Sequence, residues 1–67
     1  MNKFSERLKE LRVEKNLTTR DLSKLIDISH ATISRWENGI NDVKGSELIK
    51  LSKFFRVTTD YLLGLED

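Results

Sequence analysis

Apolar residues near the start of the chain recur at the spacing of one helical face. Phe4, Leu8 and Leu11 lie at positions i, i+4 and i+7, as in the buried stripe of an amphipathic helix. The pattern predicts a first helix over about residues 2–15. Asn16 follows directly, and asparagine tolerates the left-handed conformation in which many helices end.

A capping sequence followed by apolar residues predicts a second helix. Thr18 and Asp21 form T-x-x-D, a variant of the capping box in which two side chains satisfy the first free amides of a helix. The residues expected on the buried face are Leu22, Leu25 and Ile26. A short turn at residues 27 and 28 then separates this helix from the next one.

The third predicted helix begins and ends at recognisable residues. Ser29 is the expected N-cap, and the helix should extend to about Glu37. An Asn-Gly pair at residues 38–39 closes it, because Gly39 can adopt a positive φ at low cost.

Two more helices are predicted after a loop at residues 40–45. Ser46 is the expected N-cap of the fourth helix, and Thr58 that of a short fifth helix. The apolar residues of these helices are Leu48, Leu51, Phe54 and Phe55, then Tyr61, Leu62 and Leu63. No window alternates between apolar and polar residues as a strand does, so the fold class is all-α, a compact five-helix domain.

Composition excludes several classes of protein. A chain of 67 residues is expected to form a single domain over residues 1–67. There is no cysteine and only one histidine, so no metal site, no cofactor and no enzymatic mechanism are expected. No apolar run suits a membrane span, and the charged start lacks a signal peptide, which points to the cytoplasm. The net charge of +1 neither marks nor excludes a nucleic-acid partner.

The second and third helices form a helix-turn-helix unit over about residues 18–37. At about 100° per residue, one side of the third helix should be buried and the other should face outward. The inward residues are Ser29, Ile33, Trp36 and Glu37, and the outward residues are Ala31, Ser34, Arg35 and Asn38, flanked by His30 and Thr32. The outward side is small, polar or basic, which suits entry into a DNA major groove. Trp36 is expected in the core rather than as a stacking platform.

Several outward residues can read bases. Arg35 can donate two hydrogen bonds to O6 and N7 of a guanine, although a solvated surface arginine is the alternative. His30 lies near the end of the helix that meets base edges, or it forms only a local hydrogen bond. Ala31 can contact a thymine methyl group, or it simply favours the helix. Ser34 can bond a base or a phosphate.

Other residues are candidates for the DNA backbone. The amides near Thr18 and Thr19 begin a helix, where anions bind readily. Thr32 can donate to a phosphate or a base. Lys9 is a phosphate candidate, with a solvated helix face as the alternative.

Three segments carry a resemblance to a known family: LTTRDLS (17–23), ISHATISRWENG (28–39) and RVTTDYLLG (56–64). Together they resemble the phage repressor and Cro-type (Xre-like) helix-turn-helix family, whose fold is the lambda-repressor-like five-helix domain. The resemblance extends from Phe4 to Gly64. It implies a sequence-specific DNA-binding transcriptional regulator, a repressor, that binds a pseudo-palindromic operator as a homodimer.

The resemblance also implies roles for individual residues. Base-reading positions fall on His30, Ala31, Ser34 and Arg35, and phosphate-contacting positions on Thr19, Asn38 and Lys44. Arg12 and Glu37 match a buried salt bridge. The dimer-forming positions correspond to Thr59, Asp60, Tyr61 and Leu62, of which Tyr61 and Leu62 are expected to be exposed.

The chain departs from the family at three positions. Thr19 stands where a glutamine usually contacts phosphate and braces a base-reading side chain. Asp27 and Arg56 stand where glycine is frequent, so a positive φ at Arg56 would be strained.

One competing function remains open. The same fold serves as a protein-interaction module, such as an antitoxin or antirepressor, and a large apolar patch on the outward face of the third helix would favour it. No second domain for sensing is expected, so a protein partner or dimer dissociation is expected to relay any signal.

Overall fold

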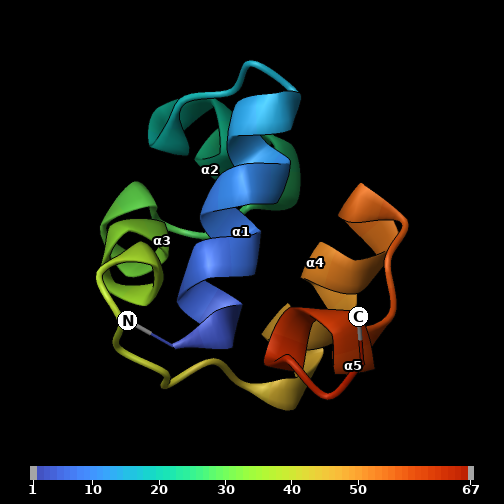
Figure 1. Ribbon diagram of the computed structural model, residues 1–67. Helices are drawn as coiled ribbons and strands as arrows, with labels where there is room; N and C mark the ends of the chain where they lie inside the picture. The colour runs from blue at the N-terminus through green and yellow to red at the C-terminus, as the bar shows by residue number, and fades with distance from the viewer. Residues whose placement is uncertain (1, 67) are drawn as a thin grey trace.

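The structure, a computed structural model, describes residues 2–66 and contains five helices and no strand over that range (Figure 1). The helices are α1 (Lys3–Glu14), α2 (Thr19–Ile26), α3 (His30–Glu37), α4 (Gly45–Phe55) and α5 (Thr59–Leu63). The predicted all-α class and the order of five short helices are therefore confirmed. No helix in residues 2–66 is long and apolar enough to cross a membrane.

Helix α1 is the central element of the fold. In Figure 1 it runs between α2 and α3 on one side and α4 and α5 on the other, and it packs against both α3 and α5. Phe4 and Trp36 meet edge to face, with ring centroids 5.9 Å apart. The buried apolar core is formed by Phe4, Leu8, Leu22, Ile26, Ile28, Ile33, Trp36, Leu51, Phe55 and Leu62. One continuous core thus joins all five helices.

The predicted capping chemistry holds the helix-turn-helix unit in place. The Thr18 hydroxyl accepts from the Asp21 amide at 3.0 Å, and the Thr18 amide donates to the Asp21 carboxylate at 3.0 Å. Asp27 ends α2 in the left-handed conformation, with φ 56° and ψ 48°. Ser29 then accepts from the Ala31 amide and begins α3.

Two local predictions are wrong. Helix α4 begins at Gly45 rather than after Ser46, because Lys44 is its N-cap and the Lys44 amide donates to the Glu47 carboxylate at 2.9 Å. Leu25 is 58% exposed instead of buried. The buried face of α2 is centred between Leu22 and Ile26, and Leu25 lies at its edge.

Candidate nucleic-acid interface

Helix α3 is fixed by its inward side. Ile33 and Trp36 are fully buried, and Glu37 is buried beside them. Ser29, predicted on the same side, is exposed because it is the cap that precedes the helix. The buried residues leave the opposite side of α3 at the surface.

The side chains on that opposite side are small or polar. Ala31, Arg35 and Asn38 are exposed, while His30, Thr32 and Ser34 are half-buried. The Asn38 amide lies 3.5 Å from the Ser34 hydroxyl. The six residues predicted to face outward therefore share one accessible surface, which we call the α3 face.

A salt bridge ties α1 to the end of α3. Arg12 donates from Nε to Glu37 Oε2 at 2.7 Å and from Nη2 to Glu37 Oε1 at 2.8 Å. A third bond runs from Arg12 Nη1 to the carbonyl of Leu17 at 2.7 Å. The two side chains are only 13% and 9% exposed, and the hydrogen bonds with Glu37 raise the pKa of Arg12 above its usual value. The two opposite charges are thus paired at a site that is mostly shielded from water.

The start of α1 also holds the end of α3. The Ser5 hydroxyl donates to the Glu37 carbonyl at 3.0 Å, and the Asn2 amide donates to the Gly39 carbonyl at 3.0 Å. These bonds occupy carbonyls at the end of α3 that have no partner within the helix. The position of α3 is therefore set by both packing and hydrogen bonds.

At the start of α2, part of the predicted anion site is already occupied. The capping box uses the Thr18 amide, and it places the exposed Asp21 carboxylate beside it. The first two helical amides, those of Thr19 and Arg20, are free of intrahelical partners by their position. The hydrogen bonds from Thr18 lower the pKa of Asp21, so the carboxylate is ionised at neutral pH.

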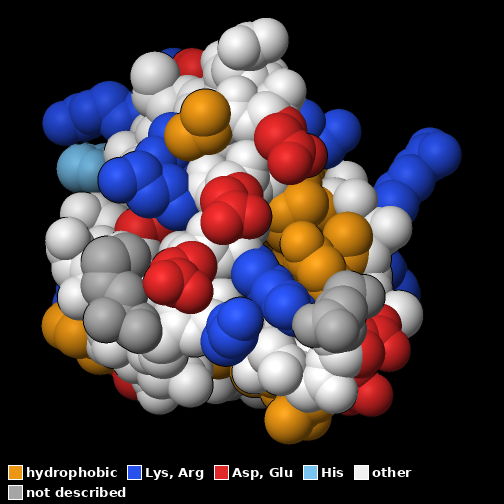
Figure 2. All heavy atoms as spheres, viewed as in Figure 1, with side chains coloured by type: hydrophobic (Ala, Val, Ile, Leu, Met, Phe, Trp, Pro, Cys, Tyr) orange, Lys and Arg blue, Asp and Glu red, His pale blue; other side chains and the backbone are white. Residues whose placement is uncertain are grey.

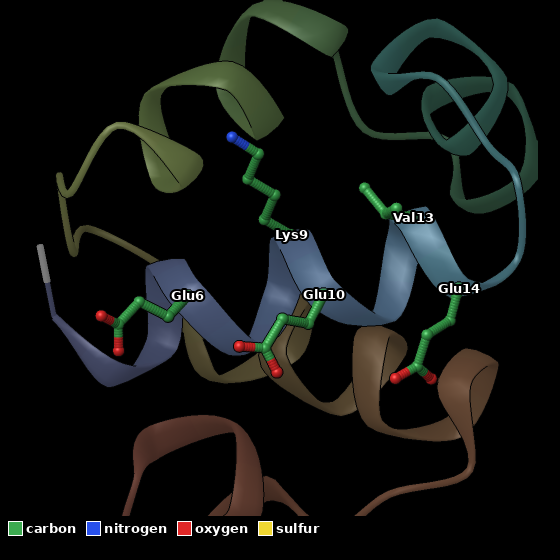
Figure 3. Close-up of a pocket in the computed structure, with 5 residues that line it drawn as sticks. All are labelled: Glu6, Lys9, Glu10, Val13 and Glu14. Atoms are coloured by element: carbon green, nitrogen blue, oxygen red, sulfur yellow. The ribbon is translucent and has the colours of Figure 1, made fainter.

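The two lysine candidates lie on different elements. Lys44 is exposed at the N-cap of α4, and its side chain makes no capping bond. Lys9 is exposed on α1, and Figure 3 shows it pointing toward α3. In the same view Glu10 and Glu14 point away from α3. A shallow hollow on this part of α1 is lined by Glu6, Lys9, Glu10, Val13 and Glu14.

A carboxylate that sequence reasoning missed lies beside the α3 face. Asp42 Oδ2 accepts from Arg35 Nη2 at 3.0 Å, and Asp42 Oδ1 accepts from Trp36 Nε1 at 2.8 Å. The expectation of a surface without acidic side chains holds for α3 itself but not for the loop that follows it. A buried tryptophan usually needs a partner for its indole N–H, and that requirement was the available signal.

Helix α5 corrects one prediction about dimerisation. Leu62 is 0% exposed, because α5 buries it in the core, so the expectation that it is exposed is wrong. Tyr61 is half-buried beneath the Arg7 guanidinium, which lies 4.2 Å from the ring centroid. Asp60 is exposed and Thr59 is half-buried.

Comparison of the sequence with known protein families agrees with this geometry. Residues 8–62 match the helix-turn-helix family, which spans the α2–α3 unit and its packing partners. The chain belongs to the Cro and repressor-type branch of that family. The family consists of DNA-binding domains of transcriptional regulators rather than enzymes.

Proteins similar to this chain include both a transcriptional activator and a repressor protein. The transcriptional activator BcrR of Enterococcus faecalis is 42% identical over 64 residues, which cover 96% of this chain and 31% of the relative. The transcriptional regulator ImmR of Bacillus subtilis is 34% identical over 64 residues, covering 96% and 50%. Repressor protein C2 of Salmonella phage P22 is 33% identical over 60 residues, covering 90% and 28%. The chain thus spans half or less of the length of these relatives.

Proposed function

We propose that this domain is a sequence-specific DNA-binding transcriptional regulator that inserts α3 into the major groove of operator DNA. One observation carries the proposal: Ile33 and Trp36 anchor α3 in the core while a side free of large apolar residues stays accessible. A major groove about 12 Å wide admits a helix presented in this way.

The residues divide into readers and anchors. In this proposal Arg35 reads a guanine, and His30, Ala31 and Ser34 contact neighbouring base edges. Backbone contacts position the domain without reading sequence. The proposed phosphate contacts come from Thr19, Thr32, Asn38, Lys44 and Lys9, and from the hydroxyl group of Thr18.

The active species is proposed to be a homodimer on a pseudo-palindromic operator, with half-sites about 34 Å apart. Thr59, Asp60 and Tyr61 supply the isologous contact in this proposal. The domain is proposed to act as a repressor in the cytoplasm. A protein partner or dissociation of the dimer is proposed to control it. The relatives support regulation in general, since one is named an activator and another a repressor.

The experiment that tests the proposal is selection of bound duplexes from a random pool, followed by sizing of the complex. We expect an enriched inverted repeat and two chains per duplex. An Arg35→Ala variant should lose preference at one base position in each half-site. Enrichment of no sequence would contradict the proposal.

The alternative function, a protein-interaction module such as an antitoxin or antirepressor, has less support. It calls for an apolar patch on the α3 face, but the large apolar residues exposed within residues 2–66 lie elsewhere. They are Val13, Leu25, Ile40, Ile49 and Leu65.

A further inference from the structure

The carboxylate of Asp42 connects a buried group in the core to an exposed group on the α3 face. Its Oδ1 accepts from the Trp36 indole at 2.8 Å, and its Oδ2 accepts from the Arg35 guanidinium at 3.0 Å. Trp36 is fully buried, whereas the side chains of Arg35 and Asp42 are about half exposed, at 47% and 48%. Within residues 2–66, Asp42 therefore links this arginine to the core through two side-chain hydrogen bonds.

From this geometry we infer that Asp42 is a positioning residue that holds the Arg35 guanidinium ready to read a guanine. The inference rests on the proposed function, because it assumes that α3 enters the major groove. It adds a specificity-determining residue that lies outside the recognition helix.

The hydrogen-bond count allows Arg35 to bind Asp42 and a base together. A guanidinium carries five N–H donors, and Asp42 accepts one bond from Nη2. Four donors remain, and recognition of guanine O6 and N7 uses two. Asp42 can thus keep its contact while the arginine reads the base, so it need not be displaced.

The anchor makes this restraint effective. The Trp36 ring packs edge to face against Phe4 of α1, so the indole N–H has a fixed direction. One oxygen of Asp42 is bound there, and the second oxygen then offers Arg35 a fixed acceptor. A side chain that is ordered before binding loses less conformational entropy when it binds.

The charge of Asp42 favours discrimination for a second reason. A carboxylate next to the α3 face repels phosphates, on which binding to unmatched DNA mostly depends. An unrestrained Arg35 would instead bond any nearby phosphate. Asp42 therefore weakens binding to unmatched DNA more than it weakens binding to the guanine at the correct place. Specificity rises because repulsion disfavours the wrong sites.

The test compares the unaltered 67-residue chain with Asp42→Asn. Asparagine keeps an oxygen for the Trp36 indole but cannot form the ion pair with Arg35. The probes are the duplex enriched by the unaltered chain and a scrambled duplex of the same composition. We expect the ratio of the two affinities to fall by at least about fivefold, the lower end of what one bidentate base contact contributes. An unchanged or increased ratio would overturn the inference.

A second readout separates positioning from a general loss of structure. Each guanine of the duplex is replaced in turn by 7-deazaguanine, which lacks the N7 acceptor. The guanine read by Arg35 is the one whose replacement weakens DNA binding by the unaltered chain but not by Arg35→Ala. The penalty for this replacement should shrink in Asp42→Asn while the melting temperature of the protein stays close to that of the unaltered chain. If the penalty keeps its full size, Asp42 does not position Arg35.

Two controls complete the design. Glu14→Gln removes an exposed negative charge on the side of α1 that points away from α3, and it should leave the affinity ratio unchanged. In an Arg35→Ala background, Asp42→Asn should change the ratio much less than it does in the unaltered chain, because the contact between the two side chains is already absent. If the unaltered chain enriches no sequence, the proposed function fails. If it discriminates but Asp42→Asn does so equally well, only the positioning role fails.

Discussion

Arg56 has a backbone conformation that disfavours side chains. It ends α4 with φ 57° and ψ 46°, a region that costs a residue with a Cβ atom about 1–2 kcal/mol. Glycine lacks this strain but gains entropy in the unfolded chain. We therefore predict that Arg56→Gly raises the free energy of unfolding by about 0.5–1 kcal/mol, as measured by urea denaturation.

Asn16 provides the matched comparison for Arg56. It has a similar φ of 58°, but asparagine visits this region more readily than arginine does. Asn16→Gly should consequently stabilise the protein less than Arg56→Gly. Equal effects of the two substitutions would show that strain at Arg56 is not the cause.

The Arg12–Glu37 pair gives a second prediction at this scale. Glu37→Ala leaves the Arg12 charge in a site where it is mostly shielded from water, so we expect a loss of about 3 kcal/mol in the free energy of unfolding. Replacing both residues, Arg12→Met with Glu37→Leu, removes both charges and should cost much less. Urea denaturation of all three proteins measures the difference. A double variant less stable than Glu37→Ala would contradict this account.

These residues also show how far sequence reasoning reached. The apolar residues of α3 identified which side is buried because they lie four residues or fewer apart, and helix geometry alone sorts them. The pairing of Arg12 with Glu37 spans 25 positions, and only the family resemblance suggested it. Asp42 was missed because its two bonds depend on how the loop at residues 40–44 folds back over α3.

At the scale of helices, local chemistry predicted the ends of helices better than their faces. The caps at Thr18, Ser29 and Thr58 were predictable because each bonds an amide two or three residues away. The exposure of Leu25 and the burial of Leu62 depend on which helices pack alongside, and one helix does not contain that information. The start of α4 was misassigned because Glu47, rather than the N-cap side chain, supplies the capping bond.

The capping box of α2 makes helix stability depend on pH. Hydrogen bonds from Thr18 lower the folded-state pKa of Asp21, so ionisation of Asp21 stabilises the folded protein. This contribution is complete above the unfolded pKa of about 3.9, and it is lost as the pH falls through the lower folded value. Asp21→Asn should therefore be less stable than the unaltered chain at pH 7, and the gap should narrow below about pH 4. Urea denaturation across this range measures it, and a constant gap would contradict the assignment.

At the scale of the whole molecule, acidic and basic side chains are unevenly distributed over the surface. Figure 2 shows acidic side chains in a row across the face on which α1 lies, with basic side chains to either side. Glu6, Glu10 and Glu14 are exposed on α1 and spaced four residues apart. The net charge of +1 therefore does not describe the charge of any one surface, and affinity for DNA cannot be judged from the sum.

Salt dependence tests whether particular cations contact phosphate. Each phosphate contact releases counterions, so the logarithm of affinity should fall linearly with the logarithm of salt concentration. Lys44→Ala should reduce that slope by about 1 and weaken all sequences alike. Its side chain makes no capping bond, so α4 should still begin at the same residue. Lys53, exposed near the other end of α4, is the matched control, and Lys53→Ala should leave the slope unchanged. Equal slopes for the unaltered chain and Lys44→Ala would remove Lys44 from the interface, because a cation that neutralises a phosphate cannot be lost without changing the number of ions released.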